Sequence, residues 1–321
     1  MSYLYDLSEK EFGDQIRRYC VDHPKLVRAL PVLDGSALML KYRKDVFYKN
    51  LWTPEILECR GTIVDAKTFV PIQRPFTKIF SESEGFSPKF DKTEEVFAFE
   101  KINGYMISAT IHDGKLLLSS TGTVDSEFVK FAKSKFAFAF GAAMRVGMIN
   151  ESFTTVFEVV DSEFDPHIIA DQDGLWALAT REKKWLSKSY FRFEGDVHEQ
   201  IHYPEMFIST FGEIQEKNES WEREGFIVQS TAAPKEIKMK SPFYTAVKFL
   251  ARKNAKTTSD LFLSFEVKGR ISTPRWFSRK TNELIRKGLS QMIERREWIL
   301  NMSEQQKVVF LRHALSSQNA S

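Results

Sequence analysis

The sequence has few of the residues from which several common kinds of site are built. Only two of its 321 residues are cysteines, Cys20 and Cys59, which excludes a disulfide framework and fits a reducing cytoplasm. The six histidines form no Ser/His/Asp or Cys/His pattern typical of nucleophilic catalysis. Apolar runs stay far short of the roughly 18 residues that span a bilayer. The N-terminus also lacks the basic and apolar regions of a secretory signal. We therefore expect no membrane partner.

The charge is small overall but unevenly distributed. Net charge is +3, with 42% hydrophobic and 28% charged residues, as in an ordinary soluble globular protein. From residue 246 onward there are 15 Lys+Arg and 6 Asp+Glu, about +9, against 31 and 37 in the remainder, about −6. A basic C-terminal block on an acidic body predicts a polyanionic partner. A solvated helical face is the alternative reading.

The sequence pattern changes near residue 250, from one that predicts both strands and helices to one that predicts helices. Ser8 and Glu11 form a predicted capping box for a first helix. Short apolar or alternating runs then predict strands, and Asp113-Gly114 predicts a hairpin turn. The expected strands cover residues 36–42, 61–65, 96–100, 105–111, 115–120, 154–160, 175–180 and 225–228. Helices are expected over 128–145, 281–301 and 303–316. This predicts a mixed α/β body over residues 1–250 and a small basic helical domain over 251–321.

Four short segments carry the candidate chemistry. Lys101, in Glu100-Lys101-Ile102-Asn103-Gly104, follows a predicted strand directly. Glu158 interrupts an apolar strand, where an unpartnered carboxylate is costly if buried. Each feature alone is weak: most K-x-x-G lysines are exposed, and a glutamate on an edge strand faces water.

The other two segments add an acidic pair and a pair of lysines. Glu222-Arg223-Glu224 precedes Gly225, which opens an apolar strand. In Ile237-Lys238-Met239-Lys240, a strand would point both lysines to one face. Two ammonium groups on one face repel unless an anion lies between them, and a phosphate or triphosphate is the natural guest.

Together these segments resemble the covalent nucleotidyltransferase superfamily of DNA ligases, RNA ligases and mRNA capping enzymes. K-x-x-G at Lys101, Glu158, E-G-F-I at Glu224 and K-M-K at Lys238–Lys240 occur in the superfamily's order. Upstream, Arg60-Gly61 opening an apolar run, then Lys78-x-Phe80, resembles the phage-type RNA ligase 1 branch. The resemblance implies an α+β fold: a nucleotidyltransferase domain with ATP-grasp-like antiparallel sheets and helices, followed by a small all-α C-terminal domain.

The resemblance also implies a reaction and the role of each residue. The reaction is ATP-dependent joining of RNA 5′-phosphate and 3′-hydroxyl ends, through lysyl-AMP on Lys101 and an RNA-adenylate. Lys238 and Lys240 would serve catalysis and phosphate binding, and Glu224 would bind Mg²⁺ or Mn²⁺. The implied nucleotide contacts are Arg60, Lys78, Phe80, Gly104 and Glu158. Repair of a cleaved tRNA in a phage-infected host cytoplasm is the implied setting.

Two positions depart from the family pattern. Thr121, before Gly122, stands where the phage branch has a lysine, which puts a γ-phosphate contact in doubt. Asn103 stands where many members have an acidic residue. The alternatives that stay open are a DNA ligase or capping guanylyltransferase, and an RNA-binding module without activity. The helical texture after residue 250 disfavours the first pair, which usually carry a β domain there.

Two further features, a histidine pair and a tryptophan, each have a simpler structural explanation. His198-Glu199-Gln200-Ile201-His202 matches a zinc-protease pattern that needs a long helix, but Gly195 and Pro204 bracket it closely. We therefore expect a polar loop and no zinc. Trp276 lies among Arg275, Arg279 and Lys280, and it could stack on a base or anchor the helical domain equally well.

Overall fold

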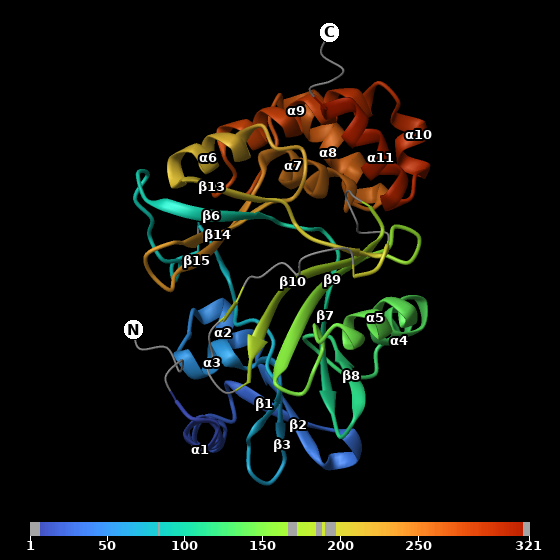
Figure 1. Ribbon diagram of the computed structural model, residues 1–321. Coiled ribbons are helices and arrows are strands. Elements are labelled where there is room, and N and C mark those ends of the chain that lie inside the picture. Colours follow the sequence, from blue (N-terminus) through green and yellow to red (C-terminus); the bar gives the residue numbers. More distant parts are fainter. Residues whose placement is uncertain (1–6, 83, 166–171, 184–187, 190–196, 317–321) are drawn as a thin grey trace. The chain divides into compact units, whose positions relative to one another are not determined.

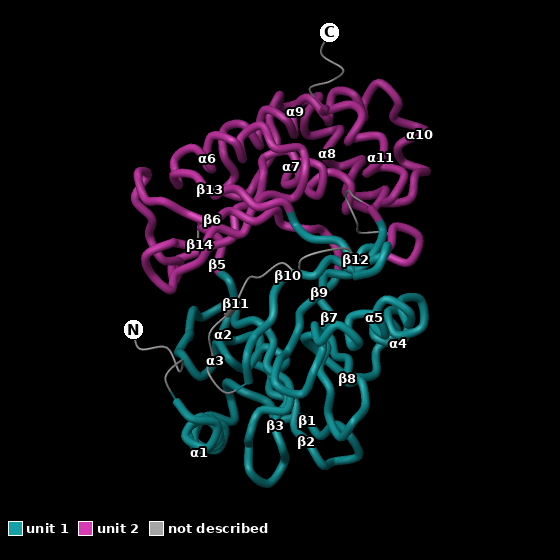
Figure 2. The backbone as a smooth tube through the Cα atoms, in the orientation of Figure 1, with its two compact units in different colours: residues 1–79, 105–160, 173–204 teal, residues 80–104, 161–172, 205–321 magenta. Residues whose placement is uncertain are grey.

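The computed structural model describes residues 7–82, 84–165, 172–183, 188–189 and 197–316 (Figure 1). The fold is mixed α+β, as predicted. The chain divides into two compact units (Figure 2). Unit 1 comprises residues 1–79, 105–160 and 173–204, and unit 2 comprises 80–104, 161–172 and 205–321. Neither unit is one continuous segment, because the chain passes from one to the other and back.

The first sheet of unit 1 is antiparallel, in the order β1-β2-β3-β4. Its strands are β1 (Val27–Val32), β2 (Ala37–Tyr42), β3 (Arg60–Asp65) and β4 (Pro71–Gln73). The helical segments near it in the chain are α1 (Glu9–Asp22), η2 (Leu33–Gly35), α2 (Lys44–Lys49) and α3 (Pro54–Glu58). The predicted capping box of α1 is confirmed, since Ser8 and Glu11 bond reciprocally. Phe12 and Ile16 are fully buried, which fixes the helix on one face.

The second sheet of unit 1 has the order β11-β10-β9-β7-β8, with β12 added parallel to β10. Its strands are β7 (Tyr105–His112), β8 (Lys115–Ser119), β9 (Phe153–Val160), β10 (Gly174–Glu182), β11 (Lys188–Ser189) and β12 (Ile201–His202). Asp113 and Gly114 both have positive φ, 49° and 68°, as a two-residue hairpin turn requires. The predicted hairpin is confirmed.

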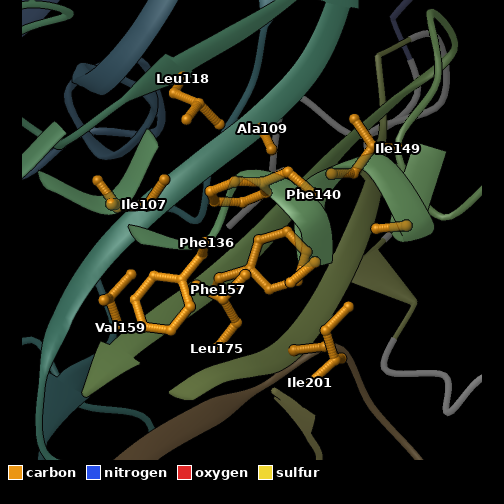
Figure 3. Close-up of a cluster of buried hydrophobic side chains, with 14 of the residues drawn as sticks. Ile107, Ala109, Leu118, Phe136, Phe140, Ile149, Phe157, Val159, Leu175 and Ile201 are labelled. Atoms are coloured by element: carbon orange, nitrogen blue, oxygen red, sulfur yellow. The ribbon is translucent and has the colours of Figure 1, made fainter. Parts of the chain in front are cut away.

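A phenylalanine-rich helical pair packs on this second sheet. The single helix expected over 128–145 was wrong: α4 (Glu127–Lys135) and α5 (Ala137–Arg145) are separated at Phe136. Phe136 has φ −106° and ψ 24°, outside the helical range, and its ring is buried. Figure 3 shows Phe136 and Phe140 packed with Phe157 in one cluster. The break lets both rings reach the sheet.

Unit 2 is built on a five-stranded sheet in the order β13-β6-β14-β15-β5. The strands are β5 (Phe80–Ser81), β6 (Glu95–Glu100), β13 (Met206–Thr210), β14 (Gly225–Ser230) and β15 (Glu236–Lys240). Only the β15–β5 pairing is parallel among these pairs. Helix α6 (Phe211–Glu219) contributes Phe211 and Ile214 to a core with Val96, Phe226 and Val228. This core holds β6 and β14 side by side.

After β15 the described residues, through Ser316, form helices and connecting turns. These helices are α7 (Pro242–Ala251), α8 (Ala255–Lys268), α9 (Arg279–Ile293), α10 (Arg296–Asn301) and α11 (Glu304–Leu315). The helix expected over 281–301 was wrong as one element, because it ends at Ile293 and restarts at Arg296. All five helices share one hydrophobic cluster. The predicted boundary at residue 250/251 falls within α7, where Leu250 and Ala251 both belong to this core, and it stays a prediction. None of the helices in the described chain has the length and apolar character to cross a bilayer.

A fully buried charge network joins three elements of unit 1. Glu58, the last residue of α3, accepts from Nε of Arg74 at 3.0 Å and forms an ion pair with its Nη2 at 2.8 Å. It also accepts from Arg181 on β10 at 2.7 and 3.1 Å. Arg181 also donates to the carbonyl oxygen of Pro75 at 2.7 Å. Burial alone would raise the pKa of Glu58, but the charges of Arg181 and Arg74 outweigh it and lower the pKa from 4.5 to about 2. The network therefore fixes the chain just before Arg60.

Replacing one member of this network is expected to destabilise the fold. Arg181→Met leaves part of the Glu58 charge buried without compensation, and we expect a loss of about 3–5 kcal/mol in the free energy of unfolding at pH 7. Because the folded-state pKa of Glu58 is lowered, the ionised Glu58 stabilises the fold fully above about pH 4.3. This stabilisation is lost as the pH falls towards 2. Urea unfolding between pH 7 and pH 3 measures both effects. Arg145→Met, at an exposed arginine, is the control, and an equal loss in both variants would contradict the assignment.

Candidate active site

Lys101 lies immediately after β6, beside the start of β14. Its backbone N–H donates to the carbonyl oxygen of Gly225 at 2.8 Å, which extends the pairing of the two strands by one residue. Its Nζ lies 3.0 Å from Oε1 of Glu224. The side chain of Lys101 is 21% exposed, so a small ligand can still reach the amine. The candidate nucleophile is therefore held at a strand end, as the sequence predicted.

Glu224 forms a second ion pair, with the ammonium group of Lys240. The Nζ of Lys240 lies 3.6 Å from the same oxygen, Oε1, that pairs with Lys101. The Glu224 side chain is only 3% exposed, so its charge is compensated by these two cations rather than by bulk water. Two ammonium groups and one carboxylate leave one positive charge in excess. Such a cluster favours an anionic ligand at its open side.

The close approach of β14 and β15 brings Glu224 and Lys240 together. Gly225 pairs with Lys240 in the antiparallel ladder and has φ +135°, a value that side chains disfavour. A Cβ at residue 225 would lie 2.0 Å from the carbonyl oxygen of Met239. Ser241 extends the pairing beyond the strand ends by donating its N–H to the Glu224 carbonyl oxygen at 2.9 Å. Only glycine fits between the two strands here.

The remaining predicted residues of unit 2 lie near the same strands. Lys238 and Lys240 alternate with buried Ile237 and Met239, so the prediction that both lysines face one side is confirmed. Phe80 is buried on β5, where it pairs with Ile237 and contacts Phe86 at 5.2 Å between ring centroids. Gly104 lies in the bend between Lys101 and β7.

Helix α7 supplies two residues that sequence reasoning did not single out. The hydroxyl of buried Tyr244 accepts from Asn103 Nδ2 and from Lys248 Nζ, both at 3.4 Å. The Nζ atoms of Lys240 and Lys248 each lie 5.3 Å from the centroid of the Tyr244 ring. Burial, then the charges of Lys240 and Arg252, lower the pKa of Lys248 to about 8. The signal in the sequence was the i, i+4 spacing of Tyr244 and Lys248 on one helix face.

The predicted nucleotide contacts of unit 1 lie on its two sheets and the segment that leaves β4. Arg60 begins β3, and its Nη1 lies 3.7 Å from Sδ of Met106. Met106 is the register partner of Glu158, which lies on β9 between β7 and β10. The alternative of an exposed edge strand for Glu158 was wrong. Lys78 is buried, with Nζ 5.2 Å from the Trp52 ring centroid.

A lysine from another strand lies at the Thr121–Gly122 turn. Lys41, the register partner of Arg60 on β2, donates from Nζ to the carbonyl oxygen of Gly122 at 3.2 Å. A Cβ at Gly61 would lie 2.9 Å from Cα of Thr121, so the turn packs tightly on β3. An ammonium group is thus present beside this turn although residue 121 is threonine. No sequence signal could have linked Lys41 to Gly122 across 81 residues.

The zinc-protease pattern and Trp276 both lie outside the lysine cluster of Lys101, Glu224 and Lys240. Residues 198–202 form a turn followed by β12, so no helix brings His198 and His202 onto one face, as expected; Gly195 lies outside the described residues. Trp276 is 65% exposed and contacts Phe277 at 4.5 Å. Phe277, rather than Trp276, packs against the helical core.

Comparison with known families identifies the chain. A family model described as RNA ligase matches residues 58–251, which is more than half of the chain and includes every candidate residue from Arg60 to Lys240. The chain belongs to the RNA ligase family. It is therefore an RNA ligase by family, with RNA as its substrate class. Among curated protein sequences, none matches it.

Several solved structures resemble the ligase at low sequence identity. Two forms of an archaeal ATP-dependent RNA ligase align over 92% and 93% of this chain and 77% and 76% of theirs. Their identities are 16% and 17%, with TM-scores of 0.49 and 0.48. A protein from Aquifex aeolicus, provisionally named an ATP-dependent DNA ligase, aligns over 92% of this chain and 78% of its own at 11% identity and a TM-score of 0.47. The family assignment rests on the sequence match alone.

Gly225→Ala is expected to disrupt the lysine cluster of the ligase. The new methyl group would collide with the Met239 carbonyl in a strained conformation, so we expect a loss of about 3 kcal/mol or more in unfolding free energy. Gly35→Ala is the matched control, because Gly35 has φ +86° but no atom within 4 Å of a Cβ. This control is expected to cost only about 1 kcal/mol. Thermal unfolding compares the two, and equal losses would contradict the packing argument.

Lys248→Met is expected to stabilise the ligase at neutral pH. The lowered pKa means that folding disfavours the charged form, so removing the charge gains about 1–2 kcal/mol after allowance for partial exposure. This gain is full below pH 8 and disappears as the pH rises towards 10.4, where the unfolded chain also loses its proton. Denaturant unfolding at pH 7 and pH 10 tests the sign. Lys256→Met, at an exposed lysine of α8, should change stability little at either pH.

Proposed function

We propose that the chain is an ATP-dependent RNA ligase that joins 5′-phosphate and 3′-hydroxyl ends through a covalent lysyl-AMP at Lys101. One observation carries the proposal: the Lys101 amine, 3.0 Å from the buried Glu224 carboxylate, shares that carboxylate with a second ammonium group, that of Lys240. A nucleophilic amine beside a site with excess positive charge suits attack on a polyphosphate.

The proposed reaction has three balanced steps. The neutral amine of Lys101 attacks the α-phosphorus of ATP, a P–N bond forms, the α–β P–O bond breaks, and pyrophosphate leaves. An RNA 5′-phosphate oxygen then attacks the same phosphorus, which breaks the P–N bond and transfers AMP to the RNA. The 3′-hydroxyl of a second end attacks the activated 5′-phosphate, and AMP leaves. The two-stage activation replaces a direct condensation that water opposes.

Lys101 must lose its proton before the first step, since a free lysine has a pKa of about 10.4. The Glu224 carboxylate, 3.0 Å from the Lys101 amine, favours the charged amine, and like-charge repulsion from Lys240 opposes it. Lys240 and Lys238 would then stabilise charge on the α-phosphate and the leaving pyrophosphate. Lys248 adds a further positive charge near Lys240, because the amines of both lysines contact Tyr244.

The remaining family positions are proposed to hold the nucleotide. Glu158 would accept from a ribose hydroxyl, and Phe80 and Gly104 would line the nucleotide site. Arg60 and Lys78 would contact the nucleotide and its phosphates. The roles of these five residues are carried over from the family position by position. Lys41 at the Thr121–Gly122 turn would supply a cation that residue 121 lacks, and this role rests on its contact with Gly122.

A divalent cation fits this donor set only as a partly hydrated ion. No group of three or more His, Cys, Asp or Glu side chains in the described residues could hold a metal by itself. Glu224 is the one carboxylate in the lysine cluster, and Mg²⁺ commonly binds one carboxylate together with phosphate oxygens and waters. Glu224 would therefore hold Mg²⁺ or Mn²⁺, which would neutralise phosphate charge when bound.

The proposed substrate is RNA with a 5′-phosphate and a 3′-hydroxyl, with repair of cleaved tRNA in the cytoplasm as the proposed setting. The support is the family resemblance and the basic charge after residue 246. We propose that residues 251–321 act as a domain that selects the RNA. The helices α7 to α11 share one core, which supports a common structural role for this region.

Incubation with [α-³²P]ATP and Mg²⁺ is expected to label the wild-type protein covalently, and Lys101→Ala to give no label. Lys240→Ala should reduce the labelling rate by at least about tenfold, because one phosphate-facing charge is lost. Lys115→Ala, at an exposed lysine of the β7–β8 hairpin, is the matched control and should label normally. Denaturing gel electrophoresis with acid lability of the P–N bond provides the measurement.

Other outcomes discriminate the alternatives. Label from GTP but not ATP would indicate a capping guanylyltransferase. Transfer of AMP to nicked DNA but not to RNA would indicate a DNA ligase. If neither nucleotide labels the protein and RNA binding is intact, the chain would be an RNA-binding module without ligase activity.

A further inference from the structure

An open groove lies among helices α9, α10 and α11 of unit 2. It has a volume of about 790 Å³. The side chains that characterise it are Lys287, Arg295, Trp298, Gln305, Phe310 and His313. None of these residues belongs to the lysine cluster around Lys101, so the groove is a separate feature of the ligase.

The groove attracts anions. Its ionisable residues are Lys287, Arg295 and His313, and no Asp or Glu is among the described residues that line it. Its other polar side chains are those of Gln291, Gln305 and Gln306, and they can both donate and accept hydrogen bonds. A lining with cations and neutral amides, without carboxylates, matches a phosphodiester chain better than an acidic or apolar protein surface.

An exposed tryptophan adds a flat apolar face to this cationic surface. Trp298 is 54% exposed although it is one of the largest apolar side chains. Phe310 meets it edge to face, with centroids 5.9 Å apart and planes at 86°. The guanidinium of Arg295 lies 5.9 Å from the Trp298 centroid and 5.6 Å from that of Phe310. The indole is thus oriented by two neighbours while a large part of it stays accessible.

The helices that form the groove also pack on the helix beside the lysine cluster. Both α9 and α11 contact α7, which carries Tyr244 and Lys248. Gly288 of α9 permits the close approach, because a Cβ there would lie 2.7 Å from a methyl carbon of Leu250 on α7. The groove and the candidate nucleophile therefore belong to one compact unit.

We propose that this groove binds an unpaired stretch of the RNA substrate, with a base stacked on Trp298 and flanking phosphates paired with Arg295 and Lys287. This proposal rests on the proposed RNA ligase function. Single-stranded RNA fits because its bases are free to stack on aromatic side chains, whereas bases in a duplex are stacked on each other. Arg295 can contact a phosphate and the aromatic rings at once.

The test measures RNA binding separately from catalysis. In the full-length Lys101→Ala protein, which cannot form lysyl-AMP, fluorescence anisotropy with a labelled unstructured 12-nucleotide RNA gives the dissociation constant at several salt concentrations. Adding Trp298→Ala is expected to weaken binding about tenfold, as loss of one stacked base predicts. Arg295→Gln is expected to weaken binding and to lower the salt slope by about one. Trp298→Phe, which keeps a stacking face, should bind within about threefold of the parent.

Matched controls separate the groove from general effects. Phe138→Ala removes an aromatic side chain that is 83% exposed but outside the groove, and Lys256→Gln removes an exposed charge on α8; both should bind RNA like the parent. When Lys101 is left intact, the Trp298→Ala single variant should form lysyl-AMP at the wild-type rate. Unchanged RNA binding by Trp298→Ala, an equal loss in Phe138→Ala, or an equal loss in Trp298→Phe would each overturn the groove proposal. Normal labelling in such a case would leave the proposed ligase function standing.

Discussion

One carboxylate oxygen organises the candidate active site. Oε1 of Glu224 forms ion pairs with both Lys101 and Lys240, although a carboxylate with a 3% exposed side chain would otherwise be costly to ionise. The two cations compensate the buried charge, and the carboxylate in turn keeps two like charges close to each other. Without Glu224 the ammonium groups would repel, and without the lysines Glu224 would be an isolated buried charge. The cluster is thus stable only as a unit, and it keeps an excess positive charge for an anion.

Backbone geometry makes this arrangement possible. Gly225 allows β14 to approach β15 so closely that Glu224 and Lys240 face each other, and the Lys101 N–H bonds to the Gly225 carbonyl. The same residue therefore connects all three members of the cluster. Helix α7 then adds Tyr244 and Lys248, and Tyr244 also belongs to the core that α7 shares with α9 and α11. In unit 1 another buried carboxylate, Glu58, is compensated by two cations, Arg74 and Arg181. This network fixes the chain next to Arg60.

Local patterns predicted the elements well where the physics is local. The capping box of α1, the Asp113–Gly114 hairpin and the common face of Lys238 and Lys240 depend on neighbours a few residues apart, and all are confirmed. The single helix expected over 128–145 was wrong for a tertiary reason. Helical periodicity continues through Phe136, but packing of its ring on the sheet breaks the helix there. Periodicity alone does not register a break that a distant partner imposes.

The sequence by itself determined which residues are available for chemistry. The order of Lys101, Glu158, Glu224, Lys238 and Lys240 indicated the family, and the family model over residues 58–251 shows it. The sequence also determined the strands and the helical C-terminal region, since periodicity and capping are short-range properties. Only the tertiary structure decided that Lys101 and Lys240 share one oxygen of Glu224, that Lys41 reaches the Thr121–Gly122 turn, and that Trp298 lies in a basic groove. These contacts join residues far apart in the chain, and burial and strand register bring them together.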